Sequence, residues 1–225
     1  MGSNILKNAY ELRSMFADIC RRTKRGIPWH PYTVESFGSE RTDTQGYFME
    51  LPECYVFAFR GTEPRIFKDV ITDAMAWKKV IPYGNDKSPI RVHYGFLRAY
   101  KSVRDRVHRI ATERLRGDKP LVVVGHSLGG ALATLCAVDM QYMMEEKLLR
   151  SGSRVVYCFT YGSPRVGNRA FAKSYDNRVP ATWRFQGAFD IITHMGPSWL
   201  GYRHVKTKFS VRCRHDIRKY IACMR

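Results

Sequence analysis

The sequence of 225 residues lacks a long apolar run. No stretch approaches the roughly 18 uninterrupted apolar residues that a membrane-spanning helix needs, so an integral membrane protein is not expected. The opening residues have neither the apolar core of a signal peptide nor, at Leu6, the Ser or Thr that a myristoylation pattern requires. From these absences we expect a cytoplasmic protein, or one that binds a membrane peripherally.

Closely spaced cysteines are also missing. The six cysteines are scattered at positions 20, 54, 136, 158, 213 and 223, without a CxxC pair. Such spacing argues against a metal site, and we expect neither a metal nor an organic cofactor. The chain has no Asn-x-Ser/Thr glycosylation sequon and no evident disulfide framework, which favours a reducing, intracellular setting.

Acidic residues are few. The chain has 20 Asp and Glu against 38 Lys and Arg, a net charge of +18, and residues 201–225 carry eight basic residues against Asp216. Such an excess attracts nucleic acid, anionic lipid surfaces or acidic proteins, and it also keeps a protein soluble. No nucleic-acid recognition motif accompanies the charge, so we expect no specific nucleic acid partner. An anionic membrane surface stays open as a partner.

Apolar periodicity divides the chain into alternating helices and strands. Helical patterns cover residues 4–24, 64–77, 95–116, 128–150, 168–177 and a segment that begins near Asp216. Strand patterns cover 33–37, 45–51, 54–59, 120–124, 155–160 and 181–185, the first two joined as a hairpin. This order predicts one domain over residues 1–225, of the α/β class, with a mostly parallel central sheet and helices on both faces.

One motif carries the chemistry of a nucleophile. Gly125-His126-Ser127-Leu128-Gly129 has the form GxSxG and stands between the strand pattern 120–124 and the next helix pattern. This strand–turn–helix context is that of the nucleophile elbow of α/β-hydrolases, which holds a serine hydroxyl on a tight turn. A serine that only caps the helix would explain Ser127 but not the glycines on both sides of it. We therefore interpret Ser127 as a nucleophile.

A serine hydroxyl needs a base to take its proton and an acid to orient that base. In this fold class the chain order is Ser, then Asp or Glu, then His. The candidates are the histidines His194, His204 and His215, and the acids Asp139, Glu145, Glu146, Asp176, Asp190 and Asp216. Asp190 follows the strand pattern 181–185 and is expected at the carboxyl edge of the sheet, where open α/β sheets place their chemistry. Order and position favour His215 as the base but leave His204 open.

Several segments resemble the class 3 lipases, a family of fungal triacylglycerol lipases, feruloyl esterases and plant plastid phospholipases. In chain order they are TDTQGY (42–47), FAFRGT (57–62), VHYGF (92–96), GHSLGG (125–130) and TYGSPRVGN (160–168). The resemblance implies an α/β-hydrolase fold in which Ser127 is the nucleophile, Asp190 the acid and His215 the base. His204 matches a non-catalytic position of the family.

The resemblance also implies an oxyanion hole. Thr62 matches the family's oxyanion residue, and the N–H of Leu128, directly after the nucleophile, supplies the second donor. Residues 63–77 match the position of the fungal lid, and the alternative is an ordinary amphipathic helix packed on the core.

The expected activity is hydrolysis of carboxylic esters of acyl lipids through a Ser-His-Asp triad and an acyl-enzyme intermediate. Triacylglycerol and phospholipid or another glycerolipid are the expected substrates. A soluble short-chain or aryl esterase, or an acyltransferase, could use the same triad. A non-enzymatic alternative is a cationic protein of this fold that only binds lipid or nucleic acid.

Overall fold

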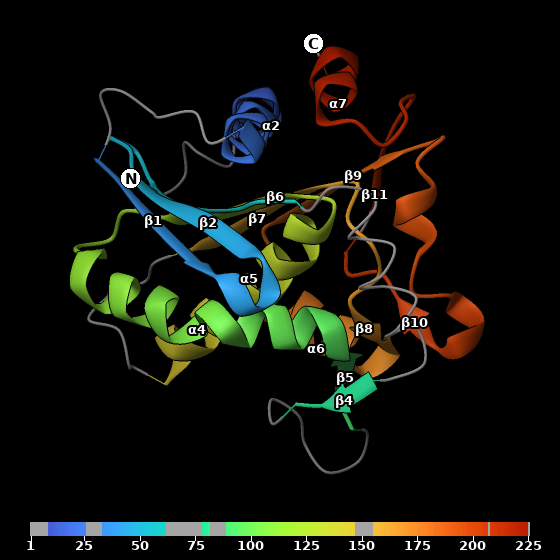
Figure 1. Cartoon of the computed structure of the whole chain (residues 1–225), viewed down its shortest axis with the longest axis horizontal. Coiled ribbons are helices and arrows are strands. Elements are labelled where there is room, and N and C mark those ends of the chain that lie inside the picture. Colours follow the sequence, from blue (N-terminus) through green and yellow to red (C-terminus); the bar gives the residue numbers. More distant parts are fainter. Residues whose placement is uncertain are drawn as a thin grey trace.

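The structure is a computed structural model that describes residues 9–25, 33–61, 78–81, 89–146, 155–206 and 208–224. Its centre is a seven-stranded sheet in the order β1-β2-β3-β6-β7-β9-β11 (Figure 1). The strands are β1 (Thr33–Ser39), β2 (Thr44–Glu50), β3 (Tyr55–Phe59), β6 (Leu121–His126), β7 (Val156–Tyr161), β9 (Thr182–Gly187) and β11 (Lys208–Val211). The β1-β2-β3 pairs are antiparallel, and every pair from β3 to β11 is parallel.

Helices cover both faces of this sheet (Figure 1). On one face lie α2 (Ala9–Arg25) and the C-terminal α7 (Ile217–Cys223), which pack against each other. On the other face lie α4 (Tyr94–Arg114), α5 (Leu128–Glu145) and α6 (Arg169–Arg178). Each face has its own buried apolar cluster, because side chains alternate between the two sides along every strand. The predicted α/β-hydrolase architecture is therefore confirmed.

A small second sheet lies beside α4 and α6. Its four short strands are antiparallel and run β10 (Tyr202–Arg203), β8 (Gly167–Asn168), β5 (Arg91–His93) and β4 (Lys78–Val80). Three short 3-10 helices complete the described elements: η1 (Glu40–Thr42), η2 (Ile191–His194) and η3 (Ser198–Leu200). The last two belong to the connection between β9 and β10, drawn in orange in Figure 1.

The predicted elements agree with the structure except at short strands. The strand patterns at 33–37, 45–51, 54–59, 120–124, 155–160 and 181–185 match β1, β2, β3, β6, β7 and β9 within a few residues. The strand β11 and the whole second sheet were not predicted. The predicted helix at 64–77 lies outside the described residues, as do the first part of the predicted helix at 4–24 and the end of the one at 128–150.

Candidate active site

Ser127 occupies the sharp turn between β6 and α5. Its backbone angles are φ 59° and ψ −128°, a conformation that non-glycine residues rarely adopt. The turn is so tight that a Cβ on Gly125 would lie 2.0 Å from the carbonyl oxygen of Gly129. The glycine at position 125 is thus a steric requirement, which confirms that the motif forms an elbow rather than an ordinary helix start.

The side chains of Ser127, His215 and Asp190 form a hydrogen-bonded chain. The Nε2 atom of His215 lies 2.8 Å from Ser127 Oγ, and its Nδ1 lies 2.9 and 2.8 Å from the two carboxylate oxygens of Asp190. Because a carboxylate can only accept, Nδ1 carries the proton and Nε2 is free to accept from the serine hydroxyl. The three residues follow β6, β9 and β11, which are parallel and so end at one edge of the sheet.

Asp190 is held by more than the histidine. Its carboxylate accepts hydrogen bonds from the N–H of Ile192 at 3.0 Å and from the hydroxyl of Tyr220 at 2.6 Å. The Tyr220 hydroxyl accepts in turn from the N–H of Gly187 at 2.7 Å, and it is fully buried. Burial and the neighbouring Asp190 raise the pKa of Tyr220, so its proton stays available as a donor. These donors fix the carboxylate against rotation.

Two further residues shape the space around this chain. Gly162 has φ +59°, and a Cβ there would lie 2.6 Å from Asp190 Oδ2 and 3.0 Å from His215 Nδ1. The buried imidazole of His126 stacks on that of His215, with ring centroids 4.6 Å apart. Burial lowers the pKa of His126 well below its ordinary value, so a neutral ring lies beside the base. Sequence reasoning singled out neither residue for these contacts.

The remaining histidine and acid candidates lie elsewhere. His204 Nε2 is 2.8 Å from the carbonyl oxygen of Thr193, and burial lowers the pKa of His204 to about 3. His194 is exposed, and Asp176 accepts from the N–H of Lys206 at 2.8 Å. Neither His204 nor Asp176 contacts the Ser127 side chain.

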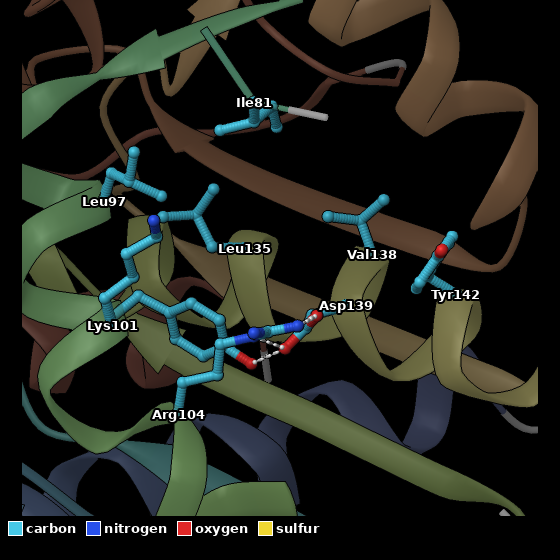
Figure 2. A pocket seen from close by; sticks show the side chains of 9 residues that line it. Ile81, Leu97, Lys101, Arg104, Leu135, Val138, Asp139 and Tyr142 are labelled. Carbon is cyan, nitrogen blue, oxygen red and sulfur yellow. Dashed lines mark hydrogen bonds and ion pairs between the residues drawn. The ribbon is translucent and has the colours of Figure 1, made fainter. Parts of the chain in front are cut away.

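Asp139 has a structural role instead. It is buried on α5 and accepts hydrogen bonds from Tyr100 Oη at 2.7 Å and, through both oxygens, from Arg104 at 2.9 Å. His108 Nε2 lies 2.6 Å from the same carboxylate. Figure 2 shows Arg104 reaching Asp139. The cavity beside them has a volume of about 210 Å³ and is lined also by Leu135 and Val138. These partners lower the pKa of Asp139 although burial alone would raise it.

The predicted oxyanion donors are described only in part. Thr62 lies outside the described residues, and so do residues 63–77, where the lid was expected. Leu128 is buried as the first residue of α5, whose first N–H groups have no partner inside the helix. The chain just after β3 also meets the elbow, since a Cβ on Gly61 would lie 2.5 Å from the carbonyl oxygen of His126.

The described residues contain no group of three or more His, Cys, Asp or Glu side chains able to hold a metal ion. Within that same part of the chain, no helix is both long and apolar enough to cross a membrane. All six cysteines are free, and five of them are buried. Burial raises the pKa of Cys54, Cys158 and Cys213 to about 12, which makes them packing residues rather than nucleophiles.

Comparisons with known proteins agree with this geometry. The family described as lipase (class 3) matches residues 56–199, more than half of the chain. A lipase of Rhizopus niveus is 32% identical over 178 residues, which are 76% of this chain and 42% of that protein. The solved structure of lipase II from Rhizopus niveus superposes with a TM-score of 0.72 at 26% identity, covering 94% of this chain and 80% of that one. A secreted mono- and diacylglycerol lipase of Fusarium solani is 35% identical over 121 residues, 52% of this chain and 33% of that protein.

Two facts limit and correct the sequence-based expectations. The chain spans less than half the length of these curated relatives. The expected cytoplasmic location is wrong by this comparison, because relatives from Fusarium solani and Malassezia restricta are named as secreted. The expectation rested on the composition of the opening residues and on unpaired cysteines, yet five of the six cysteines are buried and pack as small hydrophobes in any compartment.

Proposed function

Because the chain belongs to the class 3 lipase family, we propose that it hydrolyses the carboxylic esters of acyl glycerols, with Ser127 as the nucleophile. The observation that carries the proposal is the unbroken hydrogen-bonded chain from Ser127 Oγ through His215 to Asp190. A binding protein of the same fold would have no use for a serine on a strained turn joined to a base and a buried acid. The geometry therefore favours an enzyme over a non-catalytic lipid-binding protein.

Proton transfer follows from the hydrogen-bond directions. His215 Nε2 takes the hydroxyl proton as Ser127 Oγ attacks the ester carbonyl carbon, and Asp190 stabilises the imidazolium that forms. The same proton then passes to the leaving alcohol, and an acyl-enzyme remains on Ser127. In the second half, His215 takes a proton from water, the hydroxide attacks the acyl carbon, and the fatty acid leaves as Ser127 regains its proton.

The oxyanion of each tetrahedral intermediate needs donors. We assign these to the N–H of Leu128 and to Thr62, the residue that follows Gly61 at the end of the β3 segment. Residue 128 suits this role because its amide starts α5, where the helix dipole favours negative charge. Each such donor contributes roughly 3 kcal/mol to lowering the barrier.

The names of the relatives favour acyl glycerols as substrates. Relatives from Fusarium solani and Malassezia restricta are named mono- and diacylglycerol lipases. Exposed apolar side chains also flank the acid of the triad, with Phe189 62% and Ile191 77% exposed. Exposed apolar side chains next to the acid of the triad suit a long acyl chain better than a short polar ester. Phospholipid is the second candidate, favoured by the net charge of +18.

The experiment compares initial rates on p-nitrophenyl butyrate, on mono-, di- and triacylglycerol emulsions, and on phosphatidylcholine vesicles. We expect turnover of the soluble ester and of at least one acyl glycerol, with phosphatidylcholine hydrolysed more slowly. Ser127→Ala and His215→Gln should each reduce kcat by about 10⁴-fold or more. As a matched control, His204→Gln should retain the rate on the soluble ester. Inactivity of the wild-type protein on every acyl ester would exclude the proposal.

A further inference from the structure

The connection between β9 and β10 contains Asp190 of the triad and exposes large apolar side chains. We call residues 189–203 the rim segment; it contains Asp190 together with η2 and η3. Phe189, Ile191 and Trp199 on this segment are 62%, 77% and 80% exposed. In Figure 1 the segment forms one outer side of the molecule. A tryptophan exposed to this extent on a short turn makes little contribution to packing the fold.

Basic side chains surround the rim segment and bind its backbone. Arg165 Nη1 donates to the carbonyl oxygens of His194 at 2.6 Å and Gly196 at 3.1 Å, and Arg203 Nη1 donates to that of Ser198 at 2.9 Å. The ammonium group of Lys78, from β4, donates to the carbonyl oxygen of Leu200. Trp199 thus stands on a turn whose carbonyl groups are held by three cations.

No described acid neutralises these cations. Arg165, Arg203 and Lys78 form no ion pair with any carboxylate in the part of the chain that the structure describes. The sequence has no Asp or Glu between Asp190 and Asp216. Burial, followed by the charge of Arg203, lowers the pKa of Arg165. The positive charges therefore repel one another, and an anion placed among them would relieve that repulsion.

We propose that the rim segment docks the protein on an anionic lipid surface, with Trp199 at the headgroup boundary and Arg165, Arg203 and Lys78 facing the lipid phosphates. Indole rings favour the membrane interface, and each Lys or Arg near an anionic surface strengthens binding. The proposal rests on the proposed function, since the rim segment carries Asp190 and a lipid surface docked on it would hold the substrate of the triad. A soluble acidic protein would supply charge but no apolar phase for a side chain as exposed as Trp199.

The test measures binding to vesicles by sedimentation, using phosphatidylcholine alone and phosphatidylcholine with 30% phosphatidylglycerol (about one anion in three lipids, within the range that gives a strong surface potential). The wild-type chain should bind the anionic vesicles at least about tenfold more tightly at low salt, and high salt should remove the preference. Trp199→Ala should weaken binding about tenfold. Arg203→Gln should weaken it about fivefold, the value for one charge near the surface.

Matched controls lie on other parts of the fold. Arg109→Gln removes an exposed cation from α4, whose C-terminal end is on the opposite side of the molecule in Figure 1. Val155→Ala removes an exposed apolar side chain at the amino end of β7, away from the edge that carries Ser127. Both should bind anionic vesicles like the wild-type protein, and all four variants should hydrolyse p-nitrophenyl butyrate at the wild-type rate.

Several outcomes would overturn the docking proposal. Equal wild-type affinity for the two kinds of vesicle would do so, as would rim variants that bind like the controls. Dimerisation that Trp199→Ala abolishes, without any preference among vesicles, would assign the surface to a second copy of the chain. If the wild-type protein binds anionic vesicles as expected but hydrolyses no ester, the proposed function fails and the docking surface stands.

Discussion

At the scale of single residues, the carboxylate of Asp190 occupies the most confined position of the hydrogen-bonded chain. It is 1% exposed, and Gly162 leaves just enough room for it, with a would-be Cβ only 2.6 Å away. The backbone of Gly162 also has a positive φ, which a side chain disfavours for a separate reason. Steric and conformational effects at this position can be separated, because Gly117 has the same φ of +59°, and no atom beyond its adjacent residues lies within 4 Å of its would-be Cβ.

Gly162→Ala is expected to displace Asp190 and His215 and to lower kcat/KM on a soluble ester by about 10²-fold, the cost of misplacing catalytic groups by roughly an ångström. Gly117→Ala should retain the wild-type rate. Both variants should lose about 1 kcal/mol of unfolding free energy to backbone strain, with a further loss at position 162. Steady-state kinetics and urea unfolding measure the two effects. Equal rates for the two variants would show that Gly162 does not shape the site.

The sequence could identify the reacting groups but not what holds them. Ser127 was predicted from the glycines around it, and Asp190 from its place after a strand. The contacts of Tyr220, His126 and Gly162 depend on which elements meet at the edge of the sheet. A local sequence pattern does not indicate which elements will meet there. Tyr220 stands five residues after His215 on an unremarkable amphipathic helix, so its bond to Asp190 appears only when α7 is placed.

At the scale of elements, β11 explains how the base reaches the site. This strand pairs in parallel with β9, so the chain after it arrives at the same edge as Asp190 and Ser127. It was not predicted, because Lys208–Val211 is a short edge strand that is mostly exposed and has no apolar run. The longer strands could be predicted from their apolar runs, since both of their faces are covered by helices.

The pair α4 and α5 is joined by a buried charge rather than by apolar contacts alone. Asp139 on α5 binds Tyr100, Arg104 and His108 on α4. Because this carboxylate is 1% exposed, removing its charge leaves Arg104 without its anion near the core. The same carboxylate was one of the acids considered for the triad, so a substitution here also tests the assignment of Asp190.

Asp139→Asn should lower the unfolding free energy by about 2–3 kcal/mol, less than the full cost of breaking a buried pair because Arg104 is partly exposed. The folded fraction should retain the wild-type kcat on a soluble ester. Asp190→Asn should instead lower kcat by about 10⁴-fold and reduce the unfolding free energy less than Asp139→Asn does. A large loss of kcat in Asp139→Asn, with normal stability, would contradict both assignments.

At the scale of the whole molecule, buried neutral histidines make stability depend on pH. Burial lowers the pKa of His93 to about 4 and that of His204 to about 3, whereas both have values near 6.5 when exposed. Below pH 6.5 the unfolded chain takes up protons that the folded protein does not. Stability is therefore lost as the pH falls from about 6.5 toward the folded values.

Unfolding in urea at pH 7 and pH 5 measures this loss. Each of the two histidines should lower the unfolding free energy by about 2 kcal/mol at pH 5. His93→Asn retains an acceptor for the N–H of Phe96 but does not titrate. The difference in unfolding free energy between pH 7 and pH 5 should therefore be about 2 kcal/mol smaller in this variant than in the wild-type protein. Equal stability of the wild-type protein at both pH values would contradict the burial of neutral imidazoles.

The packing of the whole fold also explains why the family could be predicted correctly from the sequence whereas the compartment could not. The family depends on motifs fixed by the elbow and the sheet, which a sequence displays directly. The compartment was inferred from the cysteines and from the composition of the opening residues, neither of which is determined by the packing of this fold. The net charge of +18 can be read from the sequence, but only the structure places Arg165 and Arg203 on the backbone carbonyl groups of the rim segment.

The most direct test of the central claim is mass spectrometry of the intact protein, and of its peptides, after reaction with a fluorophosphonate. The nucleophile attacks phosphorus and displaces fluoride, which leaves one stable adduct. We predict a single adduct on Ser127, none in Ser127→Ala, and labelling slowed by about 10³-fold or more in His215→Gln. An unlabelled wild-type protein, or an adduct on another residue, would contradict the claim that Ser127 is an activated nucleophile.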